Sequence, residues 1–392
     1  MATATAGERR FPLWLTGIVP VVLIAALIGA FLAFDPIGSL REVPPAEALA
    51  VERTTFRDGL IELEVRNDGP DPVTVSQVLV NDAYRAFSAS DRELGRLEST
   101  TFEIPYPWDP GLPVTIGFVT STGLVIEHEV EVAAETPGFD AGTLAVYALL
   151  GLYIGVIPIA IGLLWFPALR QIGKRWMDFF LMFTIGLLLF LLVDTVAEAF
   201  ELAAAAPEAL NGLGLAAFGA IAAVLSLTFL EGVLERRGKT GALDGLALAY
   251  LIAAGIGLHN MGEGLAVGAA LATGEVALGT FLVVGFAIHN TTEGLAIVAP
   301  LGRERLRPSL WHFVAMGAIA GLPTIVGAWG GGYAYEASWA ALAFGVAAGA
   351  IAQVVWKIGQ GMVADGRLRT GHAAAGLLCG FLFMYLTGLV AG

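Results

Sequence analysis

Two copies of the pattern His-Asn-x-x-Glu-Gly lie thirty residues apart, at 259–264 and 289–294. Each copy lies inside an apolar run long enough to cross a bilayer, where histidine and glutamate are energetically costly and usually serve a function. Residues four apart share one face of a helix, so each copy presents an imidazole and a carboxylate one turn apart. Two such helices side by side would offer two imidazoles and two carboxylates to one metal ion.

The side chains of this pattern suit a divalent transition metal, because Zn²⁺ and Fe²⁺ readily accept imidazole nitrogen and carboxylate oxygen. The glycine that ends each copy allows a close approach of another helix or a local adjustment of the backbone. The alternative is that each His–Glu pair only bridges two helices, which is less expected for two matching copies. The predicted metal-binding residues are the two imidazoles, the two carboxylates and the two amides: His259, Glu263, His289, Glu293, Asn260 and Asn290.

The composition is that of a polytopic membrane protein. Hydrophobic residues make up 56% of the 392 residues and charged residues 14%, whereas a soluble protein carries roughly 25% charged residues. The mean hydropathy is +0.75, and the 50 glycines suit close packing of helices in lipid. The single cysteine, Cys379, permits no intramolecular disulfide.

The net charge of −14 is concentrated in one segment. Residues 41–140 hold 19 acidic and 7 basic residues, which gives −12, and the remaining 292 residues carry only −2. No basic patch interleaved with aromatic residues occurs in this acidic segment. Nucleic acid is therefore not an expected partner.

The chain divides into three predicted parts. Residues 1–40 contain an apolar run of about 24 residues, which favours a membrane-spanning anchor over a cleaved signal peptide. Residues 41–138 show alternating apolar and polar positions between turn residues, and about seven strands predict an immunoglobulin-like β-sandwich. Residues 139–392 contain eight further apolar runs, at 142–166, 177–203, 211–233, 243–271, 275–300, 310–333, 337–358 and 371–391.

Basic residues occur in alternate connections between these runs. Outside 41–140 all fourteen lysines and arginines either precede the anchor, as Arg9 and Arg10, or lie at or after the end of the first, third, fifth or seventh core run. The other connections carry only acids, such as Glu201 and Glu336. By the positive-inside rule the N-terminus is cytoplasmic, and the β-sandwich and the C-terminus are extracytoplasmic.

The two motifs, on the fourth and fifth core runs, resemble those of the ZIP (Zrt/Irt-like) family of divalent metal transporters. The resemblance covers residues 142–392 and indicates a divergent prokaryotic-type member with an added anchor and β-domain. It implies an eight-helix transport core that carries a divalent metal ion into the cytoplasm between these two helices. Zn²⁺ is the first expected substrate, with Fe²⁺ or Mn²⁺ as alternatives, and neither a cofactor nor an enzymatic activity is expected.

The chain departs from the family pattern at five positions. Gly262 and Thr292 stand where the family often has proline. Asn290, Thr324 and Lys357 stand where family members commonly have acids, and those acids would help to build a second metal site. We therefore expect one primary metal site. Lys357 is expected to extend towards the cytoplasmic surface, and the alternative is that its ammonium stands where a second cation would otherwise bind.

Two further groups of polar residues are relevant to ion binding. Asp194 and Glu198 are four residues apart in a stretch that resembles a family motif. We expect Asp194 to contribute to the metal path, and Glu198 more simply to lie at a solvated helix end. In the β-domain, Glu127, Glu129 and Glu131 are predicted to form a solvated acidic face, with His128 on the other side of the strand.

Two other functions are compatible with the sequence. One is an intramembrane zinc-dependent hydrolase, although Asn260 and Asn290 stand where a general base is needed and only Asp194 could replace it. The other is a non-transporting metal sensor that signals through the β-domain. The expected partners are divalent metal ions and the lipid bilayer. A homodimer is a possible assembly, and the sequence does not indicate what the β-domain binds.

Overall fold

The computed structural model describes residues 13–34, 45–237, 245–272, 276–304, 307–364, 366, 368 and 370–391. The chain forms two compact units, Met1–Ala46 and Glu47–Gly392. The first unit contains helix α1 (Leu13–Phe34), whose 22 residues give a length of about 33 Å. The apolar run predicted in residues 1–40 is therefore helical over Leu13–Phe34, whereas the residues before Leu13, with Arg9 and Arg10, lie outside the described residues.

The second unit begins with a β-domain in which every strand pairing is antiparallel. One sheet has the strand order β1-β2-β7-β5 and the other the order β4-β3-β8-β9, with β6 paired to β3. The described part of this domain has nine strands where about seven were predicted, and β4, β5 and β6 are only two or three residues long. The strands are β1 (Leu49–Arg57), β2 (Leu60–Asn67), β3 (Val73–Val80), β4 (Ala83–Arg85), β5 (Ser88–Ala89), β6 (Glu93–Leu94), β7 (Ser99–Pro105), β8 (Val114–Thr120) and β9 (Val125–Val130).

The two sheets of the β-domain share one hydrophobic core. Alternate side chains point inward, as in β2, where Leu63 and Val65 are fully buried and Glu64 between them is exposed. Phe102 of β7 and Phe118 of β8 meet edge to face, with ring centroids 5.2 Å apart. This separate β-domain confirms the change from helical to period-2 patterning in the sequence.

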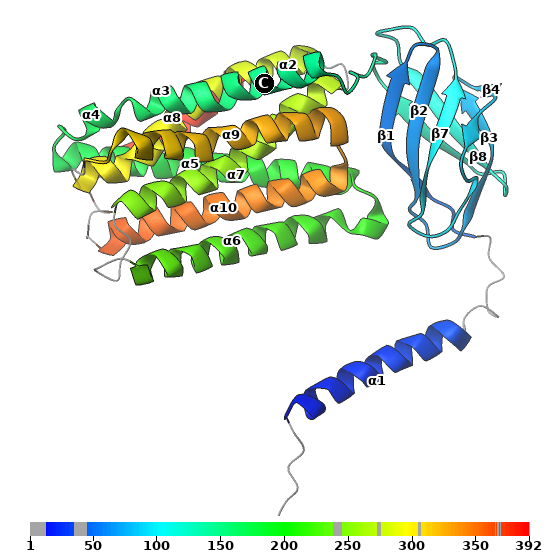
Figure 1. Cartoon of the computed structure of the whole chain (residues 1–392), viewed down its shortest axis with the longest axis horizontal. Coiled ribbons are helices and arrows are strands. Elements are labelled where there is room, and N and C mark those ends of the chain that lie inside the picture. The colour runs from blue at the N-terminus through cyan, green and yellow to red at the C-terminus, as the bar shows by residue number, and fades with distance from the viewer. Residues whose placement is uncertain are drawn as a thin grey trace, which may run out of the picture. The chain divides into compact units, whose positions relative to one another are not determined.

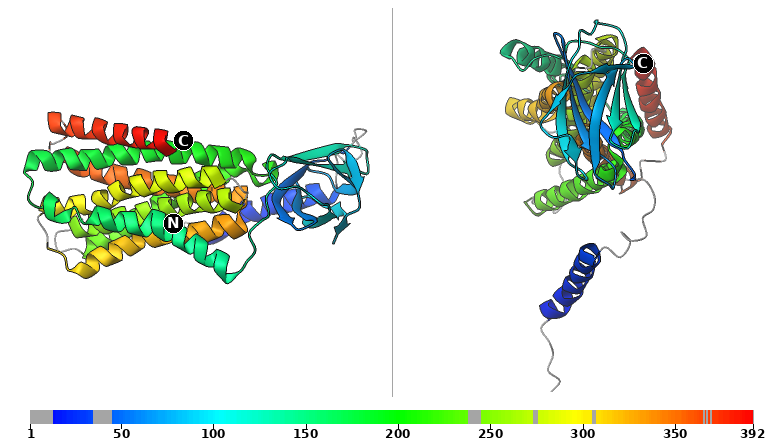
Figure 2. Two further views of the ribbon diagram at one scale, coloured as in Figure 1. Left: turned by 90° about the horizontal axis from the view of Figure 1, so that it is seen from above. Right: turned by 90° about the vertical axis from the view of Figure 1, so that its right-hand side faces the viewer.

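The rest of the second unit is a bundle of helices that lie side by side (Figures 1 and 2). In the described part of the chain, eight helical segments are long and apolar enough to cross a membrane, close to the eight predicted runs. The first segment comprises α2 (Ala141–Gly151), a π-helical turn (Leu152–Val156), α3 (Ile157–Leu163) and α4 (Phe166–Leu169). The others are α5 (Lys174–Ala205), α6 (Gly212–Arg237), α7 (Gly245–Ala272), α8 (Val276–Glu304), α9 (Leu310–Ala334), α10 (Ala337–Ala364) and α11 (Gly371–Ala391).

Helix α7 packs against α8, α9 and α10. Its approach to α9 depends on small residues, because a Cβ atom on Gly331 of α9 would collide with the backbone of Leu265 and Ala269. Gly327 makes the same kind of contact with Met261 one turn earlier. Such close backbone contacts compensate for the weak hydrophobic driving force between helices in lipid.

One carboxylate joins the β-domain to the bundle. Asp68, in the turn after β2, accepts hydrogen bonds from the backbone N–H groups of Glu208 and Ala209, both at 2.8 Å. These groups begin a 3₁₀ turn (Glu208–Leu210) between α5 and α6. Asp68 therefore caps a turn of the helical bundle.

The adjacent glycines Gly330 and Gly331 provide a matched test of this packing. A Cβ atom on Gly331 would lie 2.7 Å from Ala269 N, whereas one on Gly330 has nothing within 4 Å. We expect Gly331→Ala to destabilise the protein by about 1–3 kcal/mol through overpacking. Gly330→Ala should be neutral or slightly stabilising, because alanine favours a helix. Thermal unfolding followed by tryptophan fluorescence measures both, and equal melting temperatures would contradict the packing described.

Candidate metal centre

Helices α7 and α8 carry the two His-Asn-x-x-Glu-Gly motifs and pack against each other. His259, Glu263, His289 and Glu293 are all buried, with at most 8% of each residue exposed. The i, i+4 spacing places the histidine and glutamate of each motif on one helix face. The two motifs therefore meet inside the bundle, as the sequence predicted.

One ligand atom from each of His259, His289 and Glu293 lies within 4.8 Å of the other two. Zn²⁺ binds nitrogen and oxygen at about 2.0–2.2 Å, so the ligands of one tetrahedral ion lie roughly 3.5 Å apart. A modest inward movement of these three side chains would bring them to that spacing. They supply two imidazoles and one carboxylate, which is a ligand set suited to a divalent transition metal.

Glu263 is the fourth predicted ligand, and it contacts both imidazoles. Its Oε1 atom lies 3.2 Å from His259 Nε2 and forms a closer contact with His289 Nε2. Its Oε2 atom accepts a hydrogen bond from Asn290 Nδ2 at 2.8 Å. Glu263 therefore links the motifs of the two helices. The cluster of three ligand atoms consists of His259, His289 and Glu293 and does not include Glu263.

Each motif asparagine holds its helix to a different neighbour. Asn260 Nδ2 donates to the carbonyl of Ala320 in α9 at 3.1 Å. Asn290 Nδ2 donates to the carbonyl of Ile154, within the π-helical turn of the first segment, at 2.8 Å. Both amide nitrogens are thus used in binding backbone, and the amide oxygens are left for another partner.

Each motif glycine packs on the same neighbour as its asparagine. A Cβ atom on Gly264 would collide with the carbonyl of Thr324 in α9, and one on Gly294 would collide with that of Ile159 in α3. In each copy the histidine and the glutamate therefore supply an imidazole and a carboxylate, the asparagine binds a neighbouring backbone carbonyl, and the glycine allows the close helix contact. This confirms the close approach predicted for the two glycines.

Several buried polar atoms of the motif residues have no hydrogen-bond partner of ordinary geometry. They are both carboxylate oxygens of Glu293, the amide oxygens of Asn260 and Asn290, and His259 Nε2, whose contact with Glu263 is an ion-pair distance only. Buried polar atoms without partners are costly and uncommon. Oxygen atoms and an imidazole nitrogen are the groups that a divalent cation binds, so these atoms fit a metal ion.

A cavity of about 410 Å³ reaches the motif residues His259, Glu263 and His289. Asp194 and Glu198 of α5 also line it. Asp194 therefore lies on the wall of this cavity and not in the cluster of ligand atoms. The lining extends to Ala270, near the end of α7, and to Tyr335, just before α10.

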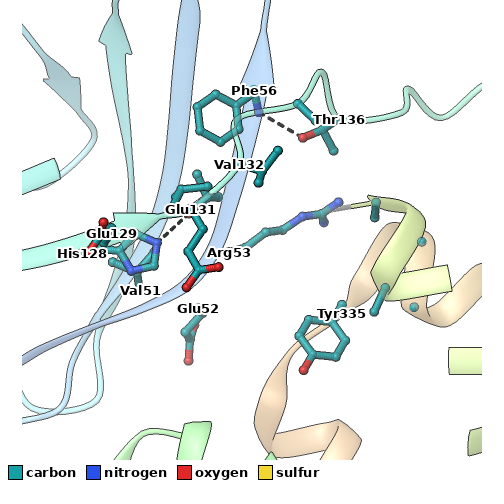
Figure 3. Close-up of a pocket in the computed structure, with 17 residues that line it drawn as sticks. Val51, Glu52, Arg53, Phe56, His128, Glu129, Glu131, Val132, Thr136 and Tyr335 are labelled. Carbon is teal, nitrogen blue, oxygen red and sulfur yellow. Dashed lines mark hydrogen bonds between the residues drawn. The ribbon is translucent and has the colours of Figure 1, made fainter. Parts of the chain in front are cut away.

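A second cavity, of about 360 Å³, lies where the β-domain meets the bundle, and Glu131 and Tyr335 are among its lining residues (Figure 3). It shares Ala269 and Tyr335 with the first cavity. Glu127 and Glu129 of β9 are exposed and His128 is half-buried, which confirms the predicted faces of this strand. His128 Nε2 contacts Thr54 Oγ1 at 3.1 Å, and burial lowers the pKa of His128.

Lys357 of α10 lies in an ion-pair cluster with α6. Its ammonium contacts Glu231 and lies 3.2 Å from Glu235, and the Lys357 side chain is only 19% exposed. Gln353 Nε2 donates to the same Glu231 at 3.2 Å. The expectation that Lys357 simply extends to the surface was therefore incomplete, because two carboxylates one turn apart on α6 hold it.

The structure adds Thr195 to the residues at this centre. Its hydroxyl lies 3.2 Å from His259 Nδ1, and the residue is 1% exposed. A single threonine in an apolar helix resembles any small core residue, so sequence reasoning had no signal for it. The adjacent Asp194 was the only indication that this turn of α5 faces the motifs.

No protein-family model matches this chain, and no curated protein matches its sequence.

Amide substitution of the two motif glutamates should have different effects on the stability of the metal-free protein. Glu263→Gln weakens contacts to His289 and Asn290 and should destabilise the protein by about 1.5–3 kcal/mol, as expected for hydrogen bonds to a charged group. Glu293→Gln removes a buried acid whose oxygens accept no hydrogen bond, so stability should stay equal or rise. Thermal unfolding in a chelator measures both variants, and a large loss for Glu293→Gln would contradict this assignment.

Lys357→Met should destabilise the protein by about 1–3 kcal/mol, because it leaves two neighbouring acids without their cation in a partly buried place. The double variant Lys357→Met with Glu231→Gln should recover part of the loss, since it removes one of those acids. The melting temperatures of the wild type, both single variants and the double variant give the coupling energy. Additive effects of the two substitutions would show that the pair is not coupled.

Proposed function

We propose that this chain is a ZIP-like transporter that carries a divalent transition metal ion into the cytoplasm, with Zn²⁺ as the first candidate and Fe²⁺ or Mn²⁺ as alternatives. The observation that carries the proposal is the meeting of His259, His289 and Glu293 at a buried point reached by a cavity. A catalytic metal site would need a general base beside the ligands, and the neighbouring residues are the amides Asn260 and Asn290.

In the proposed path, the ion enters the cavity at the end of the bundle that bears the β-domain. Asp194 and Glu198 line this cavity, and their negative charge favours cation entry. Acidic residues of the β-domain near the mouth, such as Glu129 and Glu131, would raise the local cation concentration further. At the motifs the ion exchanges water for imidazole and carboxylate ligands.

Passage beyond the motifs requires a change of conformation. Every residue of α8 from Leu295 to Leu301 is buried, and the side chains are apolar. Ile159 and Met316 belong to the same hydrophobic cluster. The ion site is therefore reached from one end and closed by apolar packing at the other, as alternating access requires. A movement of α7 and α8 relative to their neighbours would expose the ion to the opposite side.

We further propose an immunoglobulin-like β-sandwich on the extracytoplasmic side, and a cytoplasmic N-terminus. Two antiparallel sheets over one core support the sandwich. Three basic residues support this orientation through the positive-inside rule. They lie at the end of the bundle away from the β-domain: Arg170 after α4, Lys174 at the start of α5 and Arg236 near the end of α6. The C-terminus, after α11, would be extracytoplasmic in this arrangement.

Uptake of radioactive zinc into proteoliposomes tests the function and the site together. The purified full-length protein should show uptake, and the double variant His259→Ala, Glu263→Gln should reduce the initial rate at least about tenfold, because it removes one imidazole and the carboxylate that links the helices. Gly330→Ala, at a position with open surroundings, controls for reconstitution. Excess unlabelled Fe²⁺ or Mn²⁺ ranks the alternative substrates.

Three outcomes would count against the proposal in different ways. Unchanged uptake in the double variant would show that the site assignment is wrong. Tight zinc binding without uptake by the wild type would favour a sensor. Zinc-dependent turnover of a peptide or lipid without zinc flux would favour a hydrolase.

A further inference from the structure

The contact between α5 and α7 at His259 determines which imidazole nitrogen faces the site. Nδ1 of His259 lies 3.2 Å from Thr195 Oγ1, and Nε2 lies 3.2 Å from Glu263 Oε1 on the side of the candidate ligands. A neutral imidazole carries its proton on only one of these nitrogens. A metal ion bound at Nε2 therefore requires the proton to be on Nδ1.

The proton on Nδ1 needs an acceptor, because His259 is only 5% exposed. Among the described residues the hydrogen-bond partner of Nδ1 is the hydroxyl of Thr195, itself 1% exposed. A threonine hydroxyl can accept a hydrogen bond and at the same time donate one elsewhere. Outer groups that accept the second imidazole proton orient metal-binding histidines and fix their tautomer.

We propose that Thr195 is a positioning residue for metal binding: its hydroxyl accepts the Nδ1 proton of His259 and so presents the Nε2 lone pair to the ion. This inference rests on the proposed function, because it assumes that His259 binds a metal. It assigns to α5 a role in setting the affinity of a site whose ligands lie on α7 and α8. Movement of α5 relative to α7 would then change the binding of the ion without displacing any ligand directly.

Helix α5 offers a matched control for the substitution. Thr184 is also 1% exposed, and its hydroxyl donates to the carbonyl of Phe180, within the same helix. Thr195→Val and Thr184→Val therefore make the same chemical change at equal burial, but only the first removes an acceptor from His259. Thr195→Ser keeps the hydroxyl and loses a methyl group.

The experiment measures Zn²⁺ affinity of the full-length protein in detergent, by competition with a chromophoric chelator. We expect Thr195→Val to weaken binding about 10–100-fold, as is typical for the loss of such an outer partner. Thr195→Ser should bind within about threefold of the wild type, and so should Thr184→Val, because both leave the His259 acceptor in place. Thermal unfolding in a chelator should show similar metal-free stability for the two valine variants.

The outcomes separate this inference from the proposed function. If the wild type binds Zn²⁺ and Thr195→Val binds it equally well, the inference is wrong and the metal site stands. If Thr195→Ser is as weak as Thr195→Val, the effect arises from packing and the inference is also wrong. If the wild type itself binds no Zn²⁺, the proposed function and the inference both fail.

Discussion

The contact of Glu263 with the two motif histidines is the interaction on which the centre of this protein depends. A carboxylate and two imidazoles are buried together in an apolar bundle, where polar groups are stable only with partners. This contact joins α7 to α8, so the relative position of the two central helices is fixed beside the candidate ligand cluster. In the proposed function, the structural requirements and the requirements of ion binding fall on the same side chains.

The surrounding helices hold this pair in place by a repeated arrangement. Helix α9 receives the amide of Asn260 and the close contact of Gly264, whereas the first segment receives the amide of Asn290 and the close contact of Gly294. Two short motifs thus bind two different neighbours in the same way. The two asparagine nitrogens donate to backbone carbonyls, whereas the two amide oxygens are buried without a hydrogen-bond partner.

The fold could be predicted from the sequence to the extent that it follows from local patterning. Long apolar runs with charged connections specify helices of membrane length, and the alternation in 60–67 specifies a strand with one buried face. Short strands such as β5 and β6 carry too few residues for such a pattern. The pairing of Lys357 with Glu231 and Glu235 could not be predicted from the sequence either. The residues are more than 120 positions apart, and only helix packing brings them together.

By itself the sequence determined which residues stand on one helix face at the candidate centre, because the i, i+4 spacing of histidine and glutamate is a property of the helix alone. It also determined that these residues lie in segments long and apolar enough to cross a membrane, since the apolar runs around them are continuous. Only the tertiary structure decided that Glu263 contacts both histidines, that Asp194 lines the cavity without joining the ligand cluster, and that Thr195 meets His259. These contacts depend on the rotation and depth of whole helices, which are set by close packing at glycines and not by the spacing within any single segment.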